Sequence, residues 1–167
     1  GINLNEFALN ETALKQTAIS DIKLKLNKDG DAGVEIGDLN SSNFSLNGAD
    51  YEAGLGGVLI RDINASGKGE FKNLALNVAE ISLNSPKFSG FNVVAFSENF
   101  SLNDVGASLI LENNATKIGA SLGSFKTAPI DVSGAKEKLL RVDFLSANNL
   151  NFSGGEVNLE NFSVGKT

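Results

Sequence analysis

The sequence predicts an all-β protein with many short amphipathic strands, which form a sandwich or a β-solenoid-like stack, and with at most one or two short helices. Three observations support this fold class. Apolar residues alternate with polar ones, which gives each segment one apolar face. Clusters of Asn, Asp, Gly and Ser separate the segments, as hairpin turns require. Helical spacing of apolar residues is scarce.

Alternating segments recur roughly every ten residues, which is typical of sandwiches, barrels and solenoids. Turn residues stand between them, for example at 28–31, 47–48 and 154–155. The phrase Asn-Phe-Ser-Leu-Asn occurs twice, at 43–47 and 99–103, but its spacing does not define a counted repeat. The expected strands are centred on Ile22–Leu26, Val58–Ile60, Leu74–Val78, Ile81–Leu83, Phe100–Leu102, Leu109–Leu111, Ile130–Val132, Val142–Phe144, Leu150–Phe152 and Val157–Leu159.

Two segments are candidates for short helices. Glu11–Ile19 would make two turns with Asn10 as its cap, and Lys136–Arg141 would make one.

The terminal segments Ile2–Leu9 and Val157–Val164 are expected to be edge strands or donor strands. Their alternation changes phase from Leu4 to Phe7 and from Leu159 to Phe162, which indicates a bulge or a bend.

The composition limits the function. The chain has 167 residues and no Pro-rich linker or charge block, so we expect one domain over residues 1–167, which would be a module of a longer exported protein or a whole one. With no His and no Cys, thiol nucleophiles, zinc fingers and His-based acid–base pairs are excluded. No pair of carboxylates stands out, so we expect no enzyme activity, and no cofactor other than calcium at the candidate site described below.

The formal net charge is −6, and no cluster of Lys and Arg is present, which argues against nucleic-acid binding. No apolar run is long enough for a transmembrane helix. The chain begins with Gly1-Ile2 rather than Met, like a mature product, and we expect export to the cell surface or the periplasm.

The sequence offers candidates for a metal site and for a modification site. Asn27, Asp29 and Asp31 place oxygen ligands at alternate positions, and Asp38 follows at the twelfth position, as in calcium loops. A polar hairpin turn explains the same residues better, because Ala32 stands where the calcium loop needs Gly. Asn64 and Asn114 are glycosylation candidates, since each begins an Asn-x-Ser/Thr triplet preceded by an acidic residue two positions earlier.

Two segments carry a resemblance to known proteins: Gly56–Gly67 and Leu122–Gly134. Their phrasing resembles the Asn/Gly-rich exported pilus-assembly or surface-filament proteins of Gram-negative bacteria, which also have mature starts similar to Gly1-Ile2. In style the chain is equally similar to the repetitive β-rich domains of large bacterial intermembrane lipid-transport proteins. No functional residue carries over from either family.

Two functions remain open. The first, which we favour from the sequence, is a structural or interaction module of a cell-surface fibre, pilus-like assembly or adhesin, with protein partners or self-assembly through β-edges. The second is a periplasmic carrier of lipid or another hydrophobic ligand, held in an open β-groove. The two functions differ in how many apolar side chains are buried. A filled core hides nearly all of them, whereas a groove leaves a long contiguous apolar stripe exposed.

Overall fold

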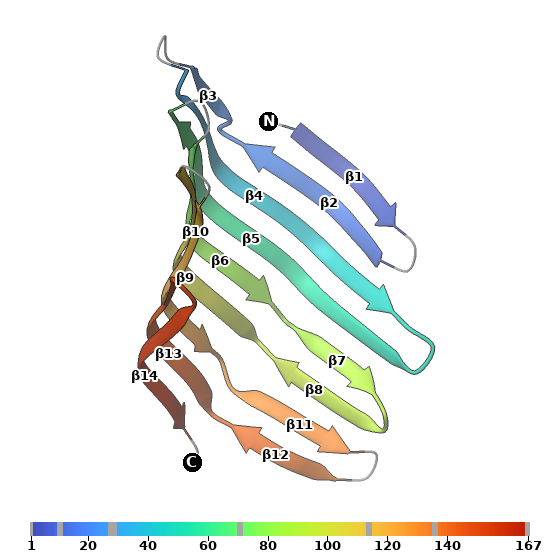
Figure 1. Ribbon diagram of the computed structural model, residues 1–167. Helices are drawn as coiled ribbons and strands as arrows, with labels where there is room; N and C mark the ends of the chain where they lie inside the picture. Colours follow the sequence, from blue (N-terminus) through green and yellow to red (C-terminus); the bar gives the residue numbers. More distant parts are fainter. Residues whose placement is uncertain are drawn as a thin grey trace.

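One antiparallel β-sheet of 14 strands contains nearly all the described residues (Figure 1). The computed structural model describes residues 2–9, 12–26, 30–69, 72–112, 115–134 and 137–165, and none of these is helical. The all-β class is therefore confirmed. The strands are β1 (Ile2–Leu9), β2 (Thr12–Ser20), β3 (Lys23–Leu26), β4 (Ala32–Asn47), β5 (Tyr51–Lys68), β6 (Asn73–Asn84), β7 (Lys87–Gly90), β8 (Val93–Ser97), β9 (Asn99–Glu112), β10 (Ala115–Thr127), β11 (Ile130–Gly134), β12 (Lys138–Val142), β13 (Phe144–Ser153) and β14 (Glu156–Gly165).

The topology is a meander. Several pairs of successive strands, such as β6 and β7 or β8 and β9, are one long strand with a short interruption. Each long strand pairs with the strand before it and the strand after it, so one end of the sheet is formed by β1 and β3 and the other by β12 and β14. The two chain termini consequently lie at opposite edges of the sheet (Figure 1).

The long strands bend where they cross one row of residues, which we call the first bend. On every second strand this row holds an Asp or Asn with a positive φ: Asp21 (+52°), Asp62 (+49°), Asp104 (+54°) and Asn149 (+53°). Asx side chains tolerate this left-handed conformation better than other non-glycine residues. The intervening strands contribute Gly37, Ala79, Gly123 and Glu160 to the same row.

The residues opposite Asp21 and Asp104 must be small, because the Asp side chains lie close to the neighbouring backbone. A Cβ atom added to Gly37 would lie 2.9 Å from Cβ of Asp21, and one added to Gly123 would lie 2.8 Å from Cβ of Asp104. The ladder pairs residues one to one on both sides of the row, for example Ile36 with Ile63 and Asp38 with Arg61. The bend therefore runs across the sheet without breaking the register.

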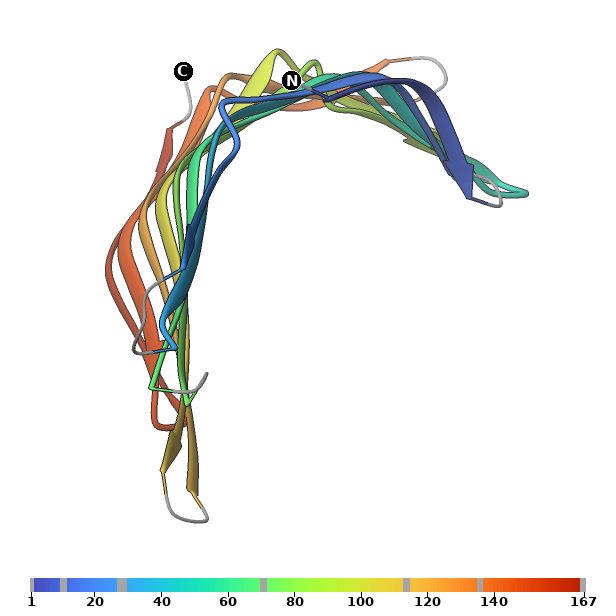
Figure 2. The ribbon, with the colours of Figure 1, turned by 90° about the horizontal axis from the view of Figure 1, so that it is seen from above.

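A second bend lies further along the strands. It passes through Asn43 and Ser85, which have φ values of +54° and +48°, and through Glu98, whose carbonyl accepts a 2.8 Å hydrogen bond from the Ser85 amide. The bends divide the sheet into three panels, which we define by the residues of β4 and their partners: a first panel (32–36), a middle panel (38–42) and a last panel (44–47). Both bends turn to the same side, so the sheet is an open arch in profile (Figure 2).

Each bend explains a phase change in the sequence. Residues three apart on a regular strand lie on opposite faces. Across the first bend, however, the apolar residues are three apart, as in Ile36 and Leu39 or Val78 and Ile81. The pair Leu159 and Phe162, where the sequence predicts a bulge or a bend, also lies across this row. The two residues between them lie on the outside of the bend, and both apolar residues lie on the inside.

The arrangement of the strands differs from the expected sandwich or solenoid, because the described sheet has one layer and no second sheet covers it. A compact monomer of this mass exposes about 7,900 Å², whereas this chain exposes 10954 Å². The strands are also longer than expected, up to the 18 residues of β5, because each bend interrupts the alternation without ending the strand.

Both expected helices are wrong. The described residues of the segment Glu11–Ile19 lie in β2, and those of Lys136–Arg141 lie mainly in β12. Pairing with neighbouring strands overrides the weak helical preference of these short segments.

We predict that Asp104→Val destabilises the fold by about 1–3 kcal/mol, because a β-branched residue is strained at positive φ. Asp104→Asn and Asp104→Gly serve as matched controls, since both residues accept this conformation, and should change stability little. Urea unfolding measures the difference. If Asp104→Val were as stable as Asp104→Asn, the left-handed residue would not be needed for the bend.

Candidate ligand-binding trough

The inner face of the arch is built from continuous apolar rows that run across the strands. One row crosses the first panel and another flanks the first bend. Because the rows follow the bend, the arch forms a trough whose axis lies perpendicular to the strands. The first row is Leu24, Val34, Ala65, Leu76, Ala107, Ala120, Phe152 and Val157, and the second is Ile36, Ile63, Val78, Val105, Leu122, Leu150 and Leu159.

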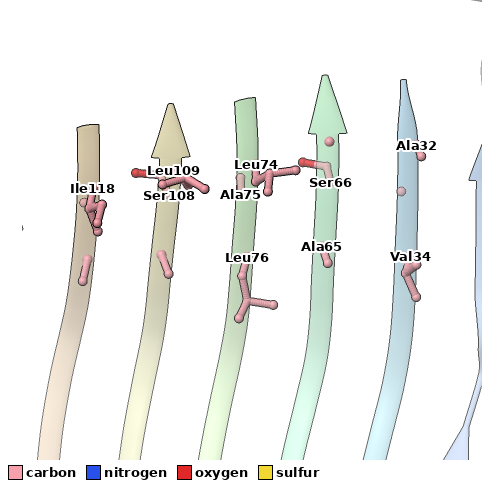
Figure 3. A pocket seen from close by; sticks show the side chains of 15 residues that line it. Ala32, Val34, Ala65, Ser66, Leu74, Ala75, Leu76, Ser108, Leu109 and Ile118 are labelled. Atoms are coloured by element: carbon pink, nitrogen blue, oxygen red, sulfur yellow. The ribbon is translucent and has the colours of Figure 1, made fainter. Parts of the chain in front are cut away.

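The first panel is hollowed along these rows. A depression of about 640 Å³ is lined by residues of β4, β5, β6, β9 and β10. Figure 3 shows Val34, Ala65 and Leu76 at one level of these five strands, and Leu74, Leu109 and Ile118 at the next. Small residues such as Ala65 and Ala107 stand beside the large ones and leave the space between them.

In the first and middle panels, the strands β3 to β6, β9, β10, β13 and β14 carry no Asp, Glu, Lys or Arg on the inner face. Ion pairs lie outside: Arg61 Nη1 is 2.8 Å from Glu80 Oε2, and Lys117 Nζ is 2.8 Å from Glu112 Oε2. The outer face also carries amide and hydroxyl ladders, such as Asn103 donating to Ser124 at 3.1 Å. The two faces of this one layer therefore differ sharply in polarity.

Hydroxyl groups line the inside of the second bend. Ser97 and Thr127 are only 2% exposed. Their hydrogen bonds go to the backbone: Ser97 Oγ donates to the carbonyl of Ala128 at 3.3 Å, and Thr127 Oγ1 accepts from the amide of Leu145 at 2.9 Å. These hydroxyls are engaged by the fold, which leaves the trough itself apolar.

The trough is open to solvent. Of the described apolar side chains only Val78 is buried, at 7% exposure, although it lies in the middle of the sheet. Leu76 is 41% exposed and Ile118 57% exposed on the inner face. Contiguous apolar surface on this scale usually marks a binding site.

The trough is long and reaches both edges of the sheet. Its first row crosses β3, β4, β5, β6, β9, β10, β13 and β14. At ~4.8 Å between neighbouring strands, the row extends over about 34 Å.

The calcium candidates are not brought together among the described residues. Asn27 and Asp29 lie outside these residues. Asp31 Oδ1 accepts a 3.0 Å hydrogen bond from the amide of Gly69, and Asp38 lies 3.9 Å from Arg61 Nε. Asp38 follows Asp31 by seven positions, which is about 23 Å along an extended strand. No cluster of three or more metal-ligating side chains occurs in the described part of the chain.

The glycosylation candidates fall in different places. Asn64 is exposed on the outer face of β5, between Glu35 and Asn77, whereas Asn114 lies outside the described residues. Tyr51, the single tyrosine, stacks on Phe88 in the last panel with ring centroids 6.4 Å apart.

Sequence reasoning missed the residues that shape the trough. The signal was present: an apolar–polar–Asx–apolar phrase occurs at 19–22, 60–63 and 102–105, about two strands apart each time. A second phrase, with a small residue after the first apolar one, occurs at 36–39, 78–81 and 122–125. Both phrases mark the first bend, and neither resembles a known catalytic or metal motif.

Comparison with known proteins finds no match to a family model, to a curated protein or to a solved structure. In the described residues, no helix has the length and apolar character needed to cross a bilayer.

The outer face supplies one pH-dependent interaction. Lys25 donates a hydrogen bond to the carboxylate of Glu35, and this bond lowers the pKa of Glu35. Partial desolvation opposes the effect, and the charges of Lys25 and Lys23 add to it. A folded-state pKa below the unfolded value stabilises the fold above the unfolded pKa, and this stabilisation is lost as the pH falls through the folded pKa.

We predict that Lys25→Met raises the pKa of Glu35 toward its ordinary value, as measured by NMR titration of the Glu35 side-chain carboxyl. Lys117→Met, which removes the partner of Glu112 instead, is the control and should leave Glu35 unchanged. An equal Glu35 pKa in the Lys25→Met variant and the unmodified chain would contradict the assignment.

Proposed function

We propose that this chain is a non-enzymatic carrier that binds the acyl chain of a lipid, or a similar long aliphatic molecule, in the trough. The observation that supports the proposal is the uncovered and uncharged inner face of a bent single-layer sheet. The sequence alone favours a structural module. The absence of a covering layer over the described sheet now favours the carrier instead.

The chemistry of the inner face selects an aliphatic ligand. Backbone amides and carbonyls within the sheet are used by the ladder, so the face offers few hydrogen bonds to a ligand. A peptide lying there would leave its own polar groups unsatisfied, at a cost of about 1–3 kcal/mol each. An acyl chain has no such groups.

The dimensions also suit an acyl chain. One leaflet of a bilayer, half of the ~30 Å hydrocarbon core, has room for one extended chain of about 15 Å. The trough, at about 34 Å, is more than twice as long. Each CH₂ group buried in it contributes about 0.8 kcal/mol, and the charged head of a lipid would remain in water beside the rim.

An envelope location follows as part of the proposal. A lipid carrier that is exported to the periplasm or the cell surface agrees with the location expected from the sequence. The proposal needs no metal or cofactor, because the apolar rows alone supply the binding energy.

Assembly through β-edges remains a second proposal. It is favoured by the edge strands β3 and β14, each of which has one paired neighbour among the described residues. On this proposal the chain is a structural component of a surface fibre, pilus-like assembly or adhesin.

We predict that a fluorescent long-chain fatty acid binds the unmodified chain and that Leu76→Asp weakens this binding at least tenfold. A tenfold loss of affinity corresponds to about 1.4 kcal/mol, and placing a charge in an apolar site costs more than that. Ala107→Trp, which fills the small space opposite Leu76, should weaken binding as well. Fluorescence titration measures both.

The matched control is Asn77→Asp, since Asn77 neighbours Leu76 in β6 but lies on the outer face. It should leave the affinity within about twofold, an energy difference below 0.5 kcal/mol. Equal losses in Leu76→Asp and Asn77→Asp would contradict binding in the trough. Sedimentation of the ligand-free chain tests the alternative that two copies cover each other's inner faces.

A further inference from the structure

The two edges of the first panel are complementary in charge. At one edge, β3 directs Lys23 and Lys25 to the outer face. At the other edge, β14 carries Glu156 in the same panel and Glu160 at the first bend. An edge strand with several charges of one sign resists pairing with itself and accepts a strand of opposite charge.

The same edges are complementary in apolar surface. On the inner face Leu24 and Leu26 of β3 are 74% and 83% exposed, and Val157 of β14 is 67% exposed. Leu24 begins the first row of the trough and Val157 ends it. The trough therefore stops at both edges without a polar or aromatic cap in the described residues.

We propose that copies of this chain join head to tail, with β14 of one copy pairing antiparallel with β3 of the next, so that the trough continues across the joint. The continuation of a ligand-binding trough rests on the proposed carrier function, whereas the pairing rests only on the edges.

The register of the joint follows from continuing each row. Val157 then lies opposite Leu24 on the inner face. On the outer face Glu156 lies opposite Lys25, and Asn158 lies opposite Lys23. Strand direction also agrees, because β3 and β14 run in opposite directions along the panel.

Outside the first panel, the two edges of the sheet end at different strands. At one edge β1 extends beyond β2 in the middle and last panels, and at the other β14 extends beyond β13 in the first and middle panels. A copy joined at β14 therefore places its β1 beside the β12 edge of the first copy. The two extensions overlap in the middle panel, where the end of β14 and the start of β1 occupy the same rows, so one of these segments must shift. The first panel is the part that meets without obstruction.

This joint is heterologous, since it uses two different edges, and it leaves a free β3 at one end and a free β14 at the other. Such contacts generate open chains of copies rather than closed dimers, unless the rotation closes a ring.

Disulfide trapping tests the joint, because the chain contains no cysteine of its own. We mix Lys23→Cys with Asn158→Cys under mild oxidation, without lipid, and expect a dimer in the mixture that neither variant forms alone. Asn77→Cys is the matched control: Asn77 lies in the same cross-strand row as Lys23 and Asn158, but in the middle of the sheet. A mixture that reacts no faster than one containing Asn77→Cys, or an equally fast reaction of Asn158→Cys with itself, overturns head-to-tail pairing.

Charge variants test the register in the same assay. Glu156→Lys places a second positive charge opposite Lys25 and should slow trapping about two- to fivefold. Glu160→Gln should accelerate it, because Glu160 lies opposite Asp21 of the next copy, and Gln can still accept the hydrogen bond from Asn149. Unchanged rates in both variants would overturn the proposed register.

The two proposals fail separately. Trapping in the mixture without fatty-acid binding would leave the joint standing and remove the carrier function. Fatty-acid binding without trapping would do the reverse.

Discussion

Every other feature of this fold depends on two bends that all the long strands make at the same levels. At the first bend a left-handed Asp or Asn lies on alternate strands, and the three Asp residues lie beside Gly or Ala, such as Asp104 opposite Gly123. Each strand reverses its pleat there, so apolar residues three apart come to the same side. The first bend, with its left-handed and small residues, thus turns a flat meander into an arch with an apolar inner face.

The bends also explain how one layer tolerates so much exposed apolar surface. Residues beside a bend cover one another across the angle, as Val78 and Thr127 show by their burial at the inside of the two bends. Residues far from a bend, such as Ile118, stay open. Polar ladders and ion pairs on the outer face keep that side in water and favour ligand binding on the other. The curvature therefore buries the residues beside the bends and leaves the apolar residues of the first panel exposed to a ligand.

The sequence supports the strand content well, because alternation over segments such as Leu74–Val78 is a local signal. It also marks the phase change between Leu159 and Phe162. It does not reveal whether two apolar faces meet, since a sandwich and an arch use the same alternation. The decisive residues, Asp21, Asp62 and Asp104, look like ordinary turn or surface residues until the ladder places them in one row. The spacing at Asn27–Asp38 matches a calcium motif, but the extended strand β4 keeps Asp31 and Asp38 apart.

The most direct test of the account is paramagnetic broadening of side-chain NMR signals by a spin-labelled fatty acid. The account predicts that the methyl groups of Leu76, Ala107 and Ile118 on the inner face are broadened more strongly than the side-chain amides of Asn77 and Asn151 on the outer face. Equal broadening on both faces, or broadening confined to the edges, would contradict an apolar trough as the ligand site. The measurement compares both faces of the same panel in one sample, so it distinguishes binding in the trough from non-specific binding to the sheet.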